Sequence, residues 1–296
     1  MTLHAPSITP VPPPRAGTAD SRNLPRTLRR LWRRHGPVWL LGQALLTLGV
    51  AWLLWALAAP ALGWAVHAAR WQAVTGNLRL FTIGAYPNGP LGGLVLTAVL
   101  TLASVALAFP LGVVLALGRR SRLPLVKGGC VSYIELVRGA PLVTVLYMVA
   151  LLVPLMVPGA ARPGDLARAV CGLAAFTAAY IAEDVRGGLA AIGGGQFEAA
   201  RALGLRSVTM LRLVILPQAL RVVAPALVGQ LISLFKNTAL VSVVSALREL
   251  VGIARAVPNQ PAYLGAYRET YVFVSVIFLA LSYVFSRASR RLEKQR

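Results

Sequence analysis

The sequence predicts an all-α integral membrane protein, and three observations carry that prediction. Of the 296 residues, 57% are hydrophobic and only 13% are charged, whereas a soluble domain carries about 25% charged residues. The apolar residues gather in six runs, and roughly 20 apolar residues are enough to cross a bilayer as a helix. The basic residues gather at the ends of those runs. This composition excludes a soluble globule, a disordered chain and a disulfide-stapled scaffold.

The net charge of +21 would indicate nucleic-acid binding on a soluble protein. Here the arginines and lysines flank apolar runs, and no interleaving of aromatic and basic residues marks a surface for stacked bases. Anionic lipid headgroups explain the charge better.

The N-terminal part is predicted to be a tail followed by an anchor. Residues 1–36 are rich in Pro and Arg and are predicted to be a disordered basic tail. Residues 37–69 carry no formal charge and exceed the apolar length of a signal peptide, so we expect an uncleaved helix over about 38–60. Residues 67–90 are rich in turn formers and are predicted to be an exposed loop. Residues 37–90 thus form an extra transmembrane helix and its loop.

Five further spans are predicted from hydropathy. They lie at about 91–118, 140–161, 166–190, 213–235 and 270–286, and a basic tail (290–296) follows. A short amphipathic stretch precedes the second of these five. The span at 166–190 is rich in Ala and Gly, and small residues let membrane helices approach closely. We therefore expect that span to be central.

The basic residues also predict the orientation. With the N-terminus in the cytoplasm, the cytoplasmic segments hold 21 Lys and Arg residues and the outer segments hold seven. Cytoplasmic loops are the ones enriched in these residues. Six spans with both termini in the cytoplasm follow, in the inner membrane of a bacterium.

Enzyme signatures are missing from the sequence. There is no phosphate-binding loop of the Gly-x4-Gly-Lys-Ser/Thr type and no Gly-x-Ser-x-Gly motif. The three histidines lack the spacing of metal ligands. We expect no catalysis, no metal and no cofactor on this chain.

The connection between the fourth and fifth spans predicts a helix–glycine–helix unit. Residues 196–203 are expected to form a short helix with Glu198 in its first turn, where a carboxylate suits the helix dipole. Gly204 is expected to end it in a left-handed conformation. A second helix over 206–213 leads to Pro217, which is expected to bend the chain at the membrane. Such a unit offers a surface to a cytoplasmic partner.

This connection resembles the EAA loop of permease subunits of ABC importers. The matching residues are Glu198, Ala199, Ala200, Gly204, Leu216 and Pro217, with Val214 in place of the more usual Ile. In that family the loop docks on the ATPase subunit, so the resemblance implies that these residues couple the chain to an ATPase. ATP and Mg²⁺ would then be bound by the partner.

Three other segments resemble permeases for polar or general L-amino acids. They are residues 133–141 (YIELVRGAP), 179–188 (AYIAEDVRGG) and 235–240 (FKNTAL). The resemblance covers about residues 91–289. It implies the type I ABC importer permease fold, with a five-helix core and one extra N-terminal helix. It also implies a second permease subunit (often a different chain), a cytoplasmic ATPase dimer and a periplasmic amino-acid-binding protein.

Polar residues at membrane depth mark a candidate substrate path. Charges there are costly and are kept for pairing or for ligands, and an amino acid needs one group for its carboxylate and one for its ammonium. Lys236, followed by Asn237 and Thr238, can supply the first; Glu183 or Asp184 can supply the second. The alternative is a structural pairing of either acid with Arg138, Arg186 or Arg221, and a structural role for Lys236.

Two other classes of function stay open at this stage. A secondary transporter or channel subunit for small polar solutes would need no docking loop and would usually show inverted repeats. A membrane-embedded enzyme would need a catalytic pair, and Glu183 with Asp184 lacks a His or Cys partner. Neither fits as well as a permease subunit.

The orientation is tested by thiol labelling in a variant without Cys130 and Cys171. A cysteine introduced near residue 85 is expected to react with a membrane-impermeant reagent added from the periplasm, and one near residue 200 is not. The reverse pattern would contradict the six-span arrangement.

Overall fold

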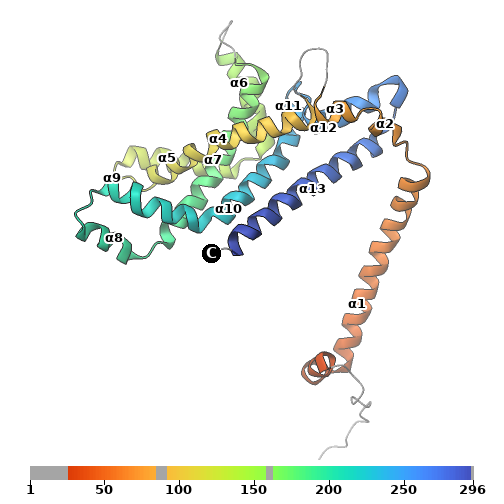
Figure 1. The fold of residues 1–296 in the computed structure, drawn as a ribbon, viewed down its shortest axis with the longest axis horizontal. Coiled ribbons are helices and arrows are strands. Elements are labelled where there is room, and N and C mark those ends of the chain that lie inside the picture. The colour runs from red at the N-terminus through yellow and green to blue at the C-terminus, as the bar shows by residue number, and fades with distance from the viewer. Residues whose placement is uncertain (1–25, 85–91, 158–162, 295–296) are drawn as a thin grey trace, which may run out of the picture. The chain divides into compact units, whose positions relative to one another are not determined.

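The computed structural model describes residues 26–84, 92–157 and 163–294, and all regular structure in those ranges is helical (Figure 1). The long helices are α1 (Arg26–His67), α4 (Gly93–Gly118), α5 (Pro124–Gly139), α6 (Leu142–Met156), α7 (Asp165–Ala191), α10 (Leu216–Asn237) and α13 (Tyr267–Lys294). The short ones are α2 (Gln72–Thr75), α3 (Leu78–Thr82), α8 (Gly194–Ala202), α9 (Ser207–Met210), α11 (Val241–Val244) and α12 (Leu250–Ala256). The predicted all-α class is confirmed.

Residues 1–69 and 70–296 form two separate units. In the first, α1 contains an apolar stretch, Leu41–His67, that is 27 residues long. None of its most apolar window is buried within the chain, as expected of a helix whose sides face lipid. The predicted tail was too long, because α1 begins at Arg26. Residues 26–35 contain no proline and are rich in Arg and Leu, which favour helix. Residues 1–25 lie outside the described part.

Helix α7 lies at the centre of the second unit, as predicted from its small residues. In its most apolar window 56% of the residues are buried, compared with 33% in α4 and 6% in α13. Glycines allow close approach on two sides. A Cβ on Gly112 of α4 would lie 2.6 Å from Cγ2 of Ile181, and one on Gly188 would lie 2.7 Å from the carbonyl oxygen of Ala219 in α10.

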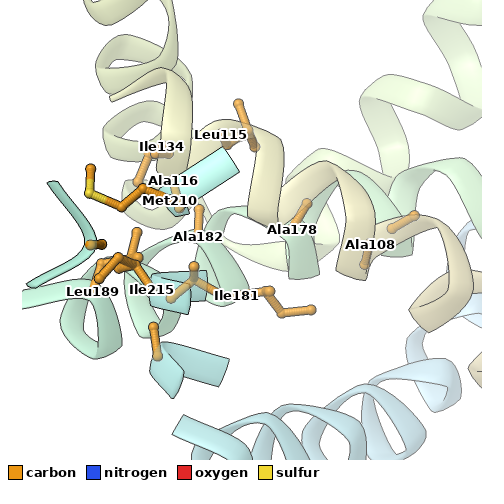
Figure 2. Close-up of a cluster of buried hydrophobic side chains, with 14 residues drawn as sticks. Ala108, Leu115, Ala116, Ile134, Ala178, Ile181, Ala182, Leu189, Met210 and Ile215 are labelled. Carbon is orange, nitrogen blue, oxygen red and sulfur yellow. The ribbon is translucent and has the colours of Figure 1, made fainter. Parts of the chain in front are cut away.

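Apolar side chains from both sides of α7 form one buried cluster at the end that leads into α8 (Figure 2). Leu115 and Ala116 come from α4, Ile134 comes from α5, and Ile181 comes from α7. The residues after α8 add Met210 and Ile215. The segment between α7 and α10 is therefore anchored in the core of the unit.

The third predicted span, 140–161, differs from the structure. Helix α6 has only 15 residues, so it is too short to cross a bilayer alone. It forms a candidate span only together with α5, and the two helices meet at an angle of 111°. Ala140 and Pro141 are extended at this break. Proline disfavours helix in the residue before it and lacks an amide hydrogen, which explains why the helix ends here.

The predicted exposed loop at 67–90 is also corrected by the structure, as far as residue 84. Helices α2 and α3 pack on α12 and α13, and they bury Ala73, Val74 and Phe81. The Phe81 ring meets Phe273 edge-on, with ring centroids 5.1 Å apart. Apolar residues between turn formers thus form a small core, although the segment is too polar to read as a span.

Glu249 fixes the start of α12, one of the helices of this small core. Its fully buried carboxylate caps α12 by accepting hydrogen bonds from the backbone N–H groups of Val251 and Gly252, at 2.8 and 2.9 Å. Burial raises the pKa of Glu249, and these backbone hydrogen bonds oppose the rise. The neighbouring Arg248 carbonyl accepts from Gly93 N–H, which joins α12 to the start of α4.

Candidate functional site

The loop between α7 and α10 contains the glycine turn that the sequence predicted. Helix α8 ends at Ala202, and Gly204 has φ +72°. The Gly204 N–H donates to the Arg201 carbonyl at 2.9 Å and the Leu205 N–H donates to the Ala200 carbonyl at 3.2 Å. This pair of bonds is the Schellman motif, which needs a left-handed residue at its centre. The left-handed Gly204 is confirmed.

One face of the loop is buried and the other is exposed. Ala200 packs in the cluster with α7, whereas Glu198 and Ala199 are exposed. Leu203 and Val208 are 79% and 76% exposed, although both are apolar. The exposed face of the loop is therefore partly apolar and carries the charge of Glu198.

Two details of the loop differ from the prediction. Helix α8 begins at Gly194, so Glu198 is its fifth residue and lies outside its first turn. The chain also stays helical through Leu216 and Pro217, which begin α10, within one helical run from Ser207 to Val244. The irregularity lies just before the proline, as a π-helical turn over Leu211–Ile215. Such a turn relieves the clash of the proline ring with the preceding turn.

Glu183 is the centre of an ion-pair cluster near the end of α7. Its Oε1 accepts from Arg186 Nε at 2.7 Å, and its Oε2 accepts from Arg119 Nη1 at 3.2 Å. Arg138 Nη1 lies 3.9 Å from the same carboxylate. Arg119 also pairs with Glu135 at 3.3 Å. The cluster ties the ends of α4 and α5 to α7. It includes Arg138 and Arg186, two of the arginines that the structural alternative named, and adds Arg119, which it did not.

Asp184, the next residue, has a different partner. Its Oδ2 accepts a hydrogen bond from Gln230 Nε2 of α10 at 2.9 Å. Within the described ranges, no Lys or Arg nitrogen forms an ion pair with Asp184. The two adjacent acids therefore face different surroundings.

A pocket of about 440 Å³ lies between α7 and α10. Its lining is mostly polar, carries no formal charge, and comprises Phe176, Thr177, Tyr180, Gln230, Ser233, Leu234 and Asn237. The Arg138 guanidinium carbon lies 5.5 Å from the centre of the Tyr180 ring, within the range of a cation–π interaction. Arg138 is thus beside the pocket and shared between Tyr180 and Glu183.

The structure separates the three consecutive polar residues of the candidate path. Asn237 lines the pocket. Thr238 is fully buried, and its hydroxyl donates to the Phe235 carbonyl at 2.7 Å. Lys236 is exposed and is not part of the lining, and its side chain pairs with no other residue of the described ranges.

Sequence reasoning missed the other pocket residues, although a signal was present. Thr177, Tyr180 and Asp184 are spaced by three and four residues, and so are Gln230, Ser233 and Asn237. This spacing places each set on one face of a helix. Two polar stripes on otherwise apolar spans could have identified the facing walls.

Comparisons with known proteins identify the family of the chain. The chain is 37% identical to a glutamate/glutamine/aspartate/asparagine transport system permease protein of Rhodobacter capsulatus, over 90% of this chain and 64% of the relative. It thus spans slightly less than two thirds of that relative's length. It is 32% identical to a probable glutamine ABC transporter permease protein of Bacillus subtilis, over 71% of this chain and 97% of the relative.

Two solved structures have a fold similar to that of this chain. A chain in the crystal structure of an amino acid ABC transporter with histidines matches with a TM-score of 0.61 and 31% identity, over 69% of this chain and 92% of that chain. The methionine ABC transporter MetNI, in an inward facing conformation, matches with a TM-score of 0.52 and 24% identity, over 67% and 90%, which bears on the fold alone. Residues 108–296 match the family described as "Binding-protein-dependent transport system inner membrane component". The chain belongs to this family of ABC importer permease components.

Proposed function

We propose that the chain is the permease subunit of an ATP-driven importer of amino acids. The observation that carries the proposal is the Schellman-capped loop between α7 and α10, exposed on one face and anchored on the other. Family membership and the amino-acid permeases among the relatives support it. They favour an ABC importer over the alternative of a secondary transporter or channel subunit.

In this proposal the loop transmits force from an ATPase. Glu198, Ala199 and Gly204 belong to the docking surface, and Ala200 joins that surface to the core. Leu216 and Pro217 begin α10, so a push on the loop acts directly on that helix. The π-helical turn over Leu211–Ile215 lies directly before them.

Partner subunits complete the proposed assembly. A second permease subunit (often a different chain), a cytoplasmic ATPase dimer that binds ATP and Mg²⁺, and a periplasmic amino-acid-binding protein are required. The basic asymmetry of the sequence supports a location in the bacterial inner membrane with both termini in the cytoplasm. Residues 91–289 would form the permease domain and residues 37–90 the extra helix with its outer segment, with residues 290–296 as a basic tail.

The substrate path is proposed to pass through the pocket between α7 and α10. Asn237, Asp184 and Arg138 lie at or beside the pocket, and Glu183 holds Arg138 in place. Lys236 supplies a positive charge next to Asn237 that no described residue neutralises. The carboxylate of an amino acid is a suitable counter-ion, as is a group on the partner subunit.

The coupling role is tested by Glu198→Lys and Gly204→Val in the complete assembly. Glu198→Lys reverses the charge of the docking surface. Gly204→Val forces a β-branched residue to positive φ, at a cost of about 1–2 kcal/mol. Both variants are expected to reach the membrane normally and to lose ATP-dependent uptake and co-purification of the ATPase.

Gly195→Val is the matched control for Gly204→Val. Gly195 is also exposed on α8, its Cβ would meet no atom within 4 Å, and its φ is not positive. It is expected to keep more activity than Gly204→Val. Normal uptake by Glu198→Lys and Gly204→Val would contradict the coupling role.

The role of Lys236 is tested by Lys236→Met, which keeps the length of the side chain and removes its charge. If Lys236 receives the substrate carboxylate, uptake is expected to fall while membrane levels and basal ATPase activity stay at wild-type values. Wild-type uptake at wild-type membrane levels would refute the assignment.

A further inference from the structure

The two adjacent acidic residues of α7, Glu183 and Asp184, differ in the partners of their carboxylates. The Glu183 carboxylate is shared by three arginines: Arg119, Arg138 and Arg186. The Asp184 carboxylate is bonded to a neutral carboxamide, that of Gln230. Arginine pairing of this kind accounts fully for Glu183 as a structural residue. It leaves the negative charge of Asp184 without a cationic partner in the described part of the chain.

Asp184 also lies at the edge of the pocket. It follows Tyr180 by one helical turn, and side chains four residues apart share a helix face. Gln230, which it contacts, is part of the lining. The charge of Asp184 is thus connected to the pocket through the Gln230 side chain.

The hydrogen bond fixes which end of the Gln230 carboxamide is available. A carboxylate can only accept hydrogen bonds, so the Gln230 group that faces Asp184 must be the NH₂. The carbonyl oxygen Oε1 is then left for other donors, and no described residue donates to it. This wall of the pocket therefore offers an acceptor that is backed by a negative charge.

The other lining residues add no positive charge that would offset the negative charge of Asp184. Thr177, Tyr180 and Ser233 contribute hydroxyl groups, and Asn237 contributes a second amide. A side-chain carboxylate at this wall would meet the Gln230 oxygen and the Asp184 charge. The cation beside the pocket, Arg138, lies over the Tyr180 ring and pairs with Glu183. A side chain that donates N–H would form a hydrogen bond there.

We propose that Asp184 is a positioning residue that sets the substrate class of the pocket. It holds the Gln230 carboxamide so that Oε1 accepts a hydrogen bond from the side chain of the transported amino acid. The pocket then takes an L-amino acid whose side chain donates N–H, such as a carboxamide, and disfavours one that ends in a carboxylate. This inference rests on the proposed function.

The test uses the purified assembly of permease and ATPase subunits without the binding protein, which would otherwise select the substrate first. Equilibrium dialysis with labelled L-glutamine, L-glutamate and L-arginine measures Kd. In Asp184→Asn, the new side chain can either donate or accept a hydrogen bond, so the orientation of the Gln230 carboxamide is no longer fixed. The Kd for L-glutamine is expected to rise about tenfold, the size of one charge-assisted hydrogen bond, at unchanged membrane levels.

The double variant Asp184→Asn/Gln230→Glu separates recognition from folding. Both changes keep the shape of the side chain, and the hydrogen bond re-forms with donor and acceptor exchanged. The negative charge now lies on the lining, so L-arginine is expected to bind at least tenfold better than it does to the wild type, and L-glutamine to bind more weakly. Gln218→Glu is the matched control, because Gln218 is on the same helix and bonds to Gln196 away from the pocket.

Two results would overturn the proposal in distinguishable ways. Equal ratios of the three Kd values in the wild type, Asp184→Asn and the double variant would show that the pair is structural, and would leave the proposed function intact. A wild-type assembly that hydrolyses ATP and binds none of the three amino acids would overturn this inference, and one that binds none of the twenty common amino acids would overturn the proposed function as well.

Discussion

The close approach of α7 to its neighbours is the constraint on which the rest of the second unit depends. Lipid tails are as apolar as leucine, so packing of small residues has to hold membrane helices together. Gly112 lets α4 meet Ile181, and Gly188 lets α7 meet the backbone of α10 at Ala219. Larger residues at these two positions would separate the helices that carry the loop, the ion-pair cluster and the pocket.

This packing explains how the pocket and the loop are joined by one helix, α7. Helix α7 bears the pocket residue Tyr180 and the ion-pair centre Glu183, and it continues into the loop that begins with α8. Its last turns lie in the same buried cluster as Met210 and Ile215, which lead into α10 (Figure 2). In the proposed coupling, a displacement of the loop reaches both walls of the pocket through this cluster. Such a connection is the physical requirement for coupling a partner to a substrate path.

Features encoded by local chemistry were predictable from the sequence. Apolar length predicted five of the six spans, small residues predicted the central place of α7, and the need for a left-handed residue predicted Gly204. The 111° break between α5 and α6 was not predictable, because Gly139 and Pro141 indicate an interruption but not its angle. The core under α2 and α3 depends on Phe273, almost 200 residues away in sequence, so no local pattern reveals it.

The candidate site was predictable only in part. The motifs identified the loop and both acids, but they could not assign the acids to different partners. That assignment depends on distances from Glu183 to Arg119, and from Asp184 to Gln230, across separate helices. Lys236 was predicted to lie on the substrate path because it is a charge in an apolar run. The neutral Asn237 beside it is the residue that lines the pocket.

The unfolding free energy of Gly188→Ala, compared with Gly187→Ala in detergent micelles, tests the central role of this packing most directly. Both changes replace a helical glycine by a better helix former, which alone stabilises by roughly 0.5–1 kcal/mol. At Gly187 a Cβ meets no atom within 4 Å, whereas at Gly188 it meets the Ala219 carbonyl. We expect Gly187→Ala to be neutral or stabilising and Gly188→Ala to destabilise by about 1–3 kcal/mol. Equal stabilisation by both would show that α7 and α10 do not approach each other as described.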